Sequence, residues 1–597
     1  MALISFKNFN FKYLDTDKNV LSNINLEVLP GEFVLFCGPS GSGKTTLLTN
    51  IKKEIRPNGH YDGKIYYDGT DLEDLEGERS ASEIGFLFQN PEDQFVSDNV
   101  IQEIAFSLEN VGLPTQEIRN RIAEMAAFFG LDKYLYKKVD ELSGGQKQLV
   151  NLCSLLVLKP KLLLLDEPTS QLDPIAAYDF ISMLRRLNEE FSITIMATEH
   201  KIDNIFPLVD KTVFLDEGYI KYIDKAREIC SRAWKDNIFS NYLPSVTKLH
   251  FLLQSKHDFL SQLEIPLNIR EGRHELNFLD NKLKQSFNSN LLDYDFSLDK
   301  NIFEKSESDP SKNSHNNSNS LLKCYDVWFG YIKEHIVLKG IFLDINKGEF
   351  LSILGGNGTG KTTLMQILSG LMKPQKGDIK IKKGKTMGYV HQNPMIHFWH
   401  DTVEEELSTS SLEELEDKIK SKNSARFKKV GSFFTQNSSK SRIFDSENKR
   451  SISEHEREEL IDFFGLSHLL SKHPYDCSGG EKQKIAIAKA LLSKPDILFL
   501  DEPTKGLDPI SKLHLANILK RLQESGLTIV MTTHDIDFAA EYSERCMILF
   551  DGTIQVDASP RAVFSNNNFY TTFMNRLVKD YLPDCITLGD VKDKWIA

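Results

Sequence analysis

The chain carries the same set of motifs twice, and this repetition limits its fold more than any other feature. GPSGSGKTT at residues 38–46 recurs as GGNGTGKTT at 355–363. LLLLDEPTSQLDP at 162–174 recurs as ILFLDEPTKGLDP at 497–509. A repeated pattern of this length predicts one folding unit that is used twice.

The spacing between the motifs is repeated as well. The interval from Ser143 to Asp166 is identical to the interval from Ser478 to Asp501. From each aspartate to the next shared histidine, the two copies differ by a single position. Equal intervals indicate elements of equal length, so we expect the two copies to share one topology.

One interval is much longer in the second copy, and the difference predicts an insertion. Gln392 and Ser478 lie farther apart in the sequence than Gln89 and Ser143 do. The extra length coincides with residues 408–454, which are rich in Ser, Lys, Glu and Asn. We expect this segment to be mobile rather than folded.

A second low-complexity stretch, KSESDPSKNSHNNSNS at 305–320, ends a poorly patterned region and is typical of an interdomain linker. We therefore predict a first repeat at 1–235, a partly disordered linker at 236–320, a second repeat at 321–570 with its insertion at about 408–454, and a C-terminal extension at 571–597.

Composition limits the location, the partners and the metal centres that we expect for the protein. No run approaches the roughly 20 apolar residues of a membrane span, and residues 1–10 lack the pattern of a secretion signal. The net charge of -13 gives no basic footprint, so we expect no nucleic-acid partner. The seven cysteines form no CxxC pair, which argues against zinc or an iron-sulfur cluster.

The pattern GxxxxGK[ST] occurs in both copies, each time after a short apolar run that is typical of a buried strand. Its glycines allow backbone N–H groups to converge on phosphate oxygens, while Lys44 and Lys361 neutralise charge. Thr45 and Thr362 can offer a hydroxyl to Mg²⁺. The residues predicted to bind nucleotide in these loops are Gly38, Pro39, Ser40, Gly41, Ser42, Gly43, Lys44, Thr45, Thr46, Gly355, Gly356, Asn357, Gly358, Thr359, Gly360, Lys361, Thr362 and Thr363.

An acidic pair ends each of two later apolar runs. We predict that the first member, Asp166 or Asp501, holds Mg²⁺ directly or through water. The second member, Glu167 or Glu502, is predicted to polarise the attacking water.

LSGGQ at 142–146 and CSGGE at 477–481 resemble the signature sequence of ATP-binding cassettes (ABC), the family that the whole motif set resembles. The resemblance implies an α/β fold with two P-loop NTPase domains. Each would have a RecA-like α/β core, a β-subdomain and an α-helical signature subdomain. Ser143, Gly144 and Gly145, with Ser478, Gly479 and Gly480, would bind the γ-phosphate held by the other domain. The sequence departs from the family's pattern around the signature, with Cys477 for the usual leucine, Glu481 for glutamine and Leu149 for a basic residue. The resemblance therefore does not fix the rate of ATP hydrolysis.

The resemblance implies roles for further residues. Those that match the family's pattern are Tyr13 and Tyr331 for stacking on adenine, Gln89 and Gln392 for sensing Mg²⁺ and water, Asp173 and Asp508 for crossing between domains, and His200 and His534 for contacting the γ-phosphate. For the two tyrosines, simple packing near the first strand of each repeat is an equally open interpretation.

The family's head-to-tail arrangement implies two ATP sites within this one chain. The expected sets are Lys44, Asp166, Glu167 and His200 with the second signature, and Lys361, Asp501, Glu502 and His534 with the first. Both sets keep their glutamate and histidine, so both are expected to hydrolyse ATP with Mg²⁺.

FQNPEDQF at 88–95 resembles the glutamine loop of energy-coupling-factor (ECF) importers, and HQNPMIHF at 391–398 places His397 where the second glutamine would fall. The resemblance implies a peripheral protein on the cytoplasmic face of the cell membrane. Its partners would be an integral membrane transporter subunit and a substrate-binding membrane subunit. The cargo would be a vitamin, a vitamin precursor or a metal ion.

Two alternatives stay open. One is a soluble tandem cassette that acts on ribosomes, although such proteins usually have basic surfaces and this chain is acidic. The other is a sugar-importer double cassette, whose members resemble a pair with one damaged site.

Overall fold

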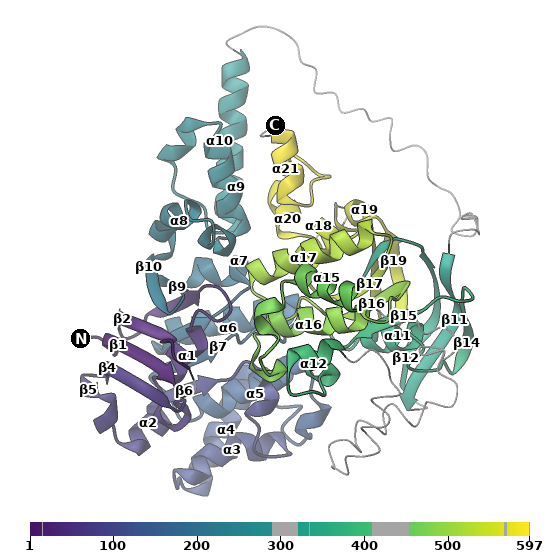
Figure 1. Cartoon of the computed structure of the whole chain (residues 1–597). Helices are drawn as coiled ribbons and strands as arrows, with labels where there is room; N and C mark the ends of the chain where they lie inside the picture. The colour runs from purple at the N-terminus through teal and green to yellow at the C-terminus, as the bar shows by residue number, and fades with distance from the viewer. Residues whose placement is uncertain are drawn as a thin grey trace.

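A computed structural model describes residues 1–14, 16–288, 320–332, 335–408, 453–565, 567 and 570–595. Nearly all of the predicted insertion at 408–454 lies outside the described residues. The same holds for the low-complexity stretch at 305–320, of which only the last residue is described. The two repeats lie side by side, with a group of helices rising above both (Figure 1).

The first repeat is built on a largely parallel sheet in the order β10-β9-β3-β8-β7-β6. Every residue of β3, β7 and β8 is buried, as expected for parallel strands covered by helices on both faces. The strands of this sheet are β3 Phe33–Cys37, β6 Ile84–Leu87, β7 Leu162–Asp166, β8 Thr194–Thr198, β9 Lys211–Asp216 and β10 Tyr219–Lys225.

An antiparallel sheet in the order β2-β1-β4-β5 stands beside this core. Its strands are β1 Ile4–Tyr13, β2 Leu21–Val28, β4 Gly59–Tyr67 and β5 Thr70–Asp71. In β2 buried and exposed residues alternate, so one face packs on the core and the other meets solvent. The helices of the first repeat are α1 Lys44–Thr49, α2 Gly77–Glu83, α3 Val100–Asn110, α4 Thr115–Phe129, α5 Gly144–Leu156, α6 Pro174–Phe191, α7 Ile202–Ile205 and α8 Ala226–Trp234.

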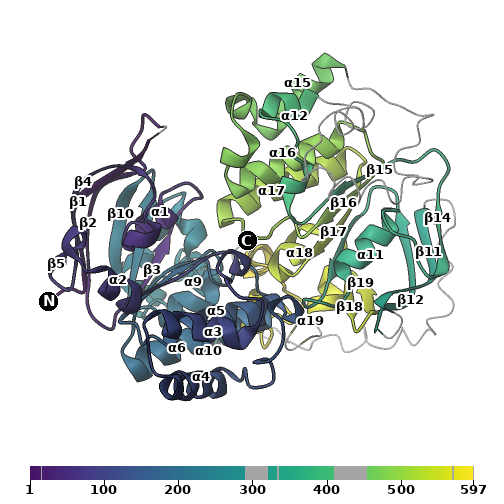
Figure 2. The same cartoon turned by 90° about the horizontal axis from the view of Figure 1, so that it is seen from below.

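The second repeat reproduces the six-stranded sheet in the order β15-β16-β17-β13-β18-β19, and its three-stranded sheet β12-β11-β14 corresponds to β2-β1-β4 of the first repeat. Its strands are β11 Ser320–Ile332, β12 His335–Asn346, β13 Phe350–Leu354, β14 Lys376–Ile381, β15 Met387–Val390, β16 Ile497–Asp501, β17 Thr528–Thr533, β18 Arg545–Phe550 and β19 Thr553–Ala558. Its helices are α11 Lys361–Leu368, α12 Val403–Ser408, α15 Glu454–Phe464, α16 Gly479–Leu491, α17 Pro509–Glu524, α18 Ile536–Tyr542 and α19 Pro560–Ser565. The shared topology predicted from equal spacing is therefore present, and Figure 2 shows the two copies from below.

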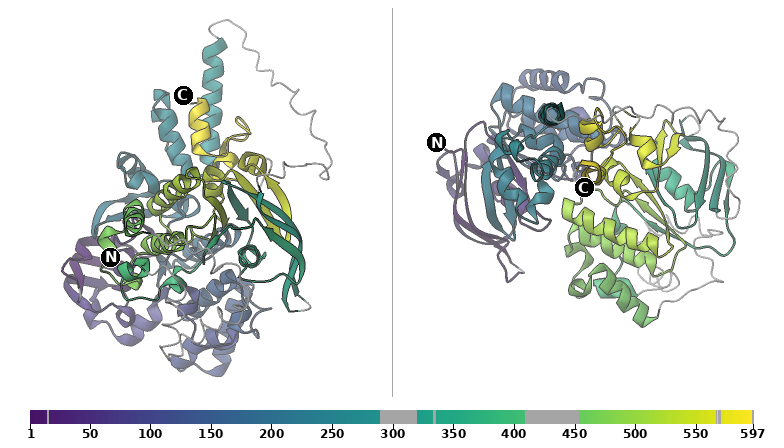
Figure 3. Two further views of the ribbon diagram at one scale, coloured as in Figure 1. Left: turned by 45° about the vertical axis from the view of Figure 1, so that its right-hand side comes forward. Right: turned by 90° about the horizontal axis from the view of Figure 1, so that it is seen from above.

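The segment predicted as a linker from residue 236 is folded as far as residue 288, which corrects the sequence analysis. It contains η6 Phe239–Tyr242, α9 Ser245–Gln254, η7 Asp258–Gln262 and α10 Ile269–Asn288. These elements pack with α20 Phe573–Val578 and α21 Leu588–Trp595 of the predicted C-terminal extension (Figures 1 and 3). We call this assembly the helical body, and we propose that the linker begins only at residue 289.

The helical body has an apolar core to which both ends of the chain contribute. Its buried members are Val246, Leu249, Leu253, Leu260, Leu276 and Leu279 from the first half, with Phe573, Met574, Leu577, Val578, Cys585 and Val591 from the second. Neither half can bury its apolar face alone, so the pairing holds the two repeats together. Among the described residues, we find no helix with the length and apolar character needed to cross a membrane.

Each repeat also anchors one half of the helical body through an aspartate. The Asp203 carboxylate accepts a hydrogen bond from the Ser245 backbone N–H at 2.6 Å, and that of Asp537 accepts one from the Phe573 N–H at 3.3 Å. Burial, together with the nearby Asp535 and Asp203, raises the pKa of the Asp537 carboxyl to about 7. Asp537 therefore binds a proton in the folded state at pH values where the unfolded chain has released it.

The sign of the resulting pH dependence follows from this raised pKa. Stability should fall as the pH rises from about 4 to 7, because only the unfolded chain gains charge freely over that range. Asp537→Asn mimics the protonated side chain, so it should match the wild type only at about pH 4 and below, where the unfolded chain is protonated as well. At pH 8 its melting temperature should be higher, by on the order of 5 °C.

Thermal unfolding of both proteins between pH 4 and pH 8 checks this expectation. Asp580→Asn is the matched control, because the Asp580 side chain is 59% exposed. Parallel pH profiles for the wild type and Asp537→Asn would contradict the prediction.

Candidate active site

The phosphate-binding loop of each repeat connects a buried central strand to a helix, β3 to α1 and β13 to α11. Gly43 and Gly360 end the two loops with φ of 98° in each case, a backbone conformation that favours glycine. A Cβ at Gly38 would lie 2.1 Å from the Leu215 carbonyl oxygen, so no larger residue fits there. The predicted glycine loops are therefore formed, with backbone N–H groups available for an anion.

Each loop is closed by its own lysine. The Lys44 ammonium donates to the carbonyl oxygens of Gly38 at 2.7 Å and Pro39 at 2.9 Å. Lys361 makes the equivalent contacts, with Gly355 at 3.0 Å and Gly356 at 2.9 Å. Burial lowers the pKa of Lys44. A buried cation whose partners include neutral carbonyls is suited to binding a phosphate.

Two of the residues predicted to hold Mg²⁺ in the first site, Thr45 and Asp166, lie together. The Thr45 hydroxyl donates to the two carboxylate oxygens of Asp166 at 3.0 and 2.9 Å, and the Thr198 hydroxyl donates to one of them at 2.8 Å. Burial raises the pKa of Asp166. A hydroxyl beside a buried carboxylate is a hard oxygen donor set, which fits Mg²⁺. Thr45 and Asp166 would hold the ion, which would neutralise charge on phosphate oxygens when bound.

The second repeat surrounds Asp501 differently. Its carboxylate accepts hydrogen bonds from the Tyr389 hydroxyl at 3.2 Å and from the Thr532 hydroxyl at 2.5 Å. Thr362 is the second residue of α11, as Thr45 is of α1. Phe86 occupies the place of Tyr389 in the first repeat, so the extra hydroxyl distinguishes the two sites.

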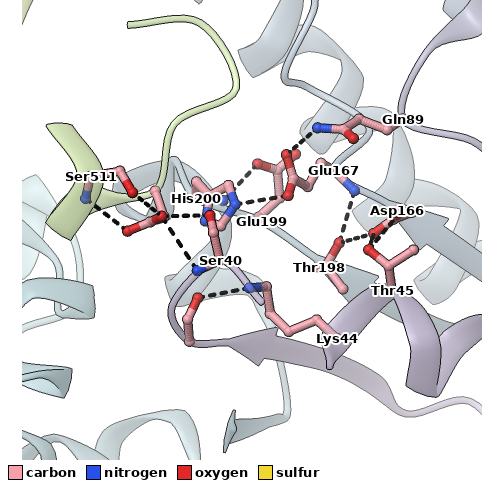
Figure 4. Close-up of polar contacts among 12 residues, drawn as sticks. Ser40, Lys44, Thr45, Gln89, Asp166, Glu167, Thr198, Glu199, His200 and Ser511 are labelled. Atoms are coloured by element: carbon pink, nitrogen blue, oxygen red, sulfur yellow. Dashed lines mark hydrogen bonds and ion pairs between the residues drawn. The ribbon is translucent and has the colours of Figure 1, made fainter. Parts of the chain in front are cut away.

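The Glu167 carboxylate contacts His200 and Gln89 in the first site (Figure 4). One carboxylate oxygen lies 2.8 Å from His200 Nε2, and the other accepts from the Gln89 side-chain amide at 2.6 Å. The backbone of Glu167 has a φ of 45°, which is uncommon for a residue with a side chain. Its N–H donates to the Thr198 hydroxyl at 2.9 Å, which helps to hold this conformation.

Glu502 has the same backbone conformation, with a φ of 47°. Its carboxylate lies 2.7 Å from His534 Nδ1 and 3.4 Å from the Lys361 ammonium. Burial lowers the pKa of His534, so the ring is neutral at pH 7 and Nδ1 can donate. Burial alone would raise the pKa of Glu502, but the hydrogen bond from His534 and the charge on Lys361 hold it at about 2. Glu502 is therefore ionised, and a carboxylate there can orient water.

The signature serines cap their own helices. The Ser143 hydroxyl accepts from the Gln146 N–H at 3.4 Å, and that of Ser478 accepts from the Glu481 N–H at 3.4 Å. The side chains of Gln146 and Glu481 in turn accept a hydrogen bond from the N–H of Ser143 and Ser478, which completes a capping box in each helix. Glu481 can replace glutamine in this structural role. The pairing of either signature with an ATP molecule stays a prediction.

Tyr13 and Tyr331 both reach the start of the helix that follows the P-loop. Their hydroxyls lie 3.0 Å from the Thr46 hydroxyl and 3.1 Å from the Thr363 hydroxyl. Tyr331 is 63% exposed, so its ring is available to a planar ligand. Stacking of these rings on adenine remains a prediction.

The two repeats meet at the first P-loop, where Asp508 of the second repeat contacts Ser40. One carboxylate oxygen of Asp508 accepts from the Ser40 hydroxyl at 2.5 Å and from its N–H at 3.3 Å. Figure 4 shows Ser511, in the first turn of α17, close to Ser40 of the other repeat. Asp508 thus crosses between repeats, and Asp173 occupies the equivalent position as the N-cap of α6.

Sequence reasoning missed two residues that shape this site. Glu199 accepts hydrogen bonds from the N–H groups of Thr169 at 2.8 Å and His200 at 3.1 Å, and burial raises its pKa. Tyr242, in the segment predicted as linker, donates its hydroxyl to Asp508 at 3.2 Å. Glu199 directly precedes His200, so its position could have indicated a role at the site. No motif surrounds Tyr242.

This arrangement suits the hydrolysis of a phosphoanhydride. A glycine loop with a lysine binds the phosphates, a hydroxyl and a carboxylate suit a divalent cation, and an ionised glutamate can polarise water. A histidine contacts that glutamate in both repeats.

Comparison with known proteins agrees with this chemistry. The family model described as ABC transporter matches residues 21–170 and 338–505. A Bacillus anthracis protein provisionally named an ABC transporter ATP-binding protein is 40% identical, over 99% of this chain and 98% of the relative. A Methanosarcina acetivorans protein of the same provisional name is 30% identical, over 95% of this chain and 86% of the relative. An archaeal ribosome recycling factor, solved with the stalk protein aP1, has a TM-score of 0.52 at 21% identity and covers 93% of this chain and 90% of its own. At that identity the likeness shows the fold alone.

We expect the double variant Glu167→Gln, Glu502→Gln to lose at least about 100-fold in steady-state ATP hydrolysis. An amide keeps the shape of the side chain but cannot polarise water as a carboxylate does. Phosphate release measures the rate, and equilibrium binding should show that ATP is still bound.

Glu109→Gln is the matched control, because Glu109 is an exposed glutamate at the end of α3. A double variant that kept more than about a tenth of the wild-type rate would show that these carboxylates do not assist the reaction.

Proposed function

The chain belongs to the ABC transporter family, and from this membership we propose that it is the ATP-hydrolysing component of an importer of the energy-coupling-factor type. Its membrane-spanning parts would be other chains. Two ATP molecules between the repeats would close them, and hydrolysis would open them. The protein would then lie on the cytoplasmic face of the membrane and move helices of the membrane subunit.

The observation that supports this proposal is the construction of the two glutamine loops. In the first, the Gln94 side chain accepts from the Phe88 N–H at 3.3 Å. In the second, His397 Nε2 accepts from the His391 N–H at 2.9 Å. Burial lowers the pKa of His397 to about 3, so the ring is neutral and can accept. His397 therefore performs the loop-closing role of Gln94, and both loops keep one shape.

Each glutamine loop is followed by a short segment that begins at Val96 in the first repeat and at Trp399 in the second. The two segments have the same pattern of backbone hydrogen bonds but different side chains. The N–H groups of Val96 and Ser97 donate to Glu103 at 2.9 and 2.8 Å, and those of Trp399 and His400 donate to Glu406 in the same pattern. Two surfaces of one shape and different chemistry would suit two different helices of a membrane subunit.

The first surface presents two exposed apolar side chains to solvent. Val96 is 66% exposed and Tyr136 is 85% exposed. Their segments are held together by backbone bonds from Val139 to Asp98 at 2.8 Å and from Ile101 to Leu135 at 2.9 Å. Exposed apolar side chains on a rigid backbone are typical of a protein-docking surface. We propose that a coupling helix of the membrane subunit binds there.

The cargo would be a vitamin, a vitamin precursor or a metal ion, recognised by a separate small membrane subunit. The sugar-importer alternative is less well supported, because both repeats keep the glutamate and histidine in contact. The ribosome-acting alternative gains no support beyond the shared fold.

The test uses the double variant Glu167→Gln, Glu502→Gln, held closed with Mg-ATP and purified from gently solubilised cells. Mass spectrometry should find a multi-helix membrane protein together with a small membrane partner. Ribosomal proteins in their place would overturn the proposal and favour the translation-factor alternative.

A surface variant tests the docking step separately. Tyr136→Asp places a charge on the proposed docking surface, so it should abolish recovery of the membrane subunit and leave ATP binding unchanged. Phe342→Asp is the matched control, because Phe342 is 63% exposed and belongs to β12. Full recovery of the membrane subunit with Tyr136→Asp would contradict the proposed position of the coupling helix.

A further inference from the structure

The helical body contacts the meeting point of the two repeats through a buried tyrosine. Tyr242 ends η6, shortly before α9, and its side chain is fully buried. Its hydroxyl donates to one carboxylate oxygen of Asp508 at 3.2 Å, while the other oxygen accepts from the Ser40 hydroxyl at 2.5 Å. A chain of two hydrogen bonds therefore joins the helical body to the first P-loop.

Asp508 is held on several sides by donors. The oxygen bonded to Tyr242 also accepts from the N–H groups of Ile510 and Ser511, each at 3.0 Å. The Ser511 hydroxyl donates to the other oxygen at 2.6 Å. Burial would raise the pKa of Asp508, but the bonds from Ser40 and Ser511 outweigh it and hold the pKa well below its usual range. The ionised carboxylate has a fixed orientation, and Tyr242 is one of the groups that set it.

The second half of the helical body places a tyrosine in the corresponding position. Tyr570 lies just before α20, as Tyr242 lies just before α9. It is largely buried beside Gly355 of the second P-loop, and the negative charge of Asp173 contributes to the raised pKa that burial gives it. Asp173 is the repeat-one equivalent of Asp508. Each half of the helical body thus presents a tyrosine near a P-loop and the crossing aspartate of the other repeat.

The same helices are anchored beside the predicted histidines. Asp203, which accepts from the Ser245 N–H, closely follows His200 in the sequence. Asp537, which accepts from the Phe573 N–H, follows His534 at the same spacing. The position of α9 and α20 is therefore tied to both repeats near their active sites.

We propose that Tyr242 is a positioning residue that couples the helical body to ATP binding in the first site. It orients Asp508 so that this carboxylate accepts from Ser40, and Ser40 lies in the loop that holds the phosphates. Because coupling between two sites is reciprocal, ATP in the first P-loop also stabilises the seating of the helical body. Tyr570 occupies the corresponding place beside the second P-loop, but among the described residues its hydroxyl makes no hydrogen bond to Asp173.

The proposal rests on ATP binding by the family and not on import. It is therefore tested on the isolated full-length chain, whereas the import proposal is tested by the membrane proteins that co-purify. Failure of one leaves the other intact.

The test is Tyr242→Phe, made in the hydrolysis-deficient Glu167→Gln, Glu502→Gln background and titrated with Mg-ATP. Loss of the hydroxyl should raise the Kd of one of the two bound ATP molecules roughly five- to tenfold. The ring keeps its packing, so the melting temperature should fall by no more than about 2 °C. An unchanged Kd would overturn the proposal.

Two comparisons separate positioning from a merely structural role. Tyr222→Phe is the matched control, because the Tyr222 hydroxyl lies 3.4 Å from a carboxylate oxygen of Asp236, away from Asp508. It should leave both Kd values unchanged. In an Asp508→Ala background, Tyr242→Phe should shift the Kd by less than about twofold, because its partner is gone. A full shift in that background, or an equal shift with Tyr222→Phe, would also overturn the proposal.

Discussion

The buried carboxylate of Asp508 is the interaction on which the arrangement of the two repeats depends. An ionised carboxylate away from water is costly unless hydrogen-bond donors surround it. Here the donors come from its own helix, from Ser40 of the opposite repeat and from Tyr242 of the helical body. Three parts of the chain that are distant in sequence must therefore meet correctly for one charge to be satisfied. That requirement selects one relative placement of the repeats over others that would bury similar apolar area.

Within each repeat, the order of strands in the sheet brings the site residues together. In the first repeat β8 pairs in parallel with both β3 and β7, so the carboxyl ends of these strands share one edge. The P-loop, the acidic pair and the histidine follow those three strands. Chemistry that is scattered along the sequence from Lys44 to His200 is thus gathered at a single edge, as is usual in open α/β sheets. The second repeat gathers its own set through the same order.

Much of this could be predicted, because the motifs are local and their roles follow from short spacings. Lys44 and Glu167 are predicted from the residues around them, His200 from the resemblance to the family, and the equal intervals predict the repeated topology. The helical body could not be found in the same way. Its apolar face is completed by residues from beyond the second repeat. Neither half has a sequence pattern that indicates its packing against the other half. Tyr242 was missed for the same reason, since its partner lies in the other repeat.

The shared core of the helical body bears on the role of the covalent connection between the repeats. Residues from before and after the second repeat already pack together, so the repeats would be held side by side even if the chain were divided after α10. The peptide link is then not needed for attraction between the halves. Its consequence is stoichiometric, because every molecule contains one of each half. A pair with two unlike surfaces is therefore made every time the gene is translated.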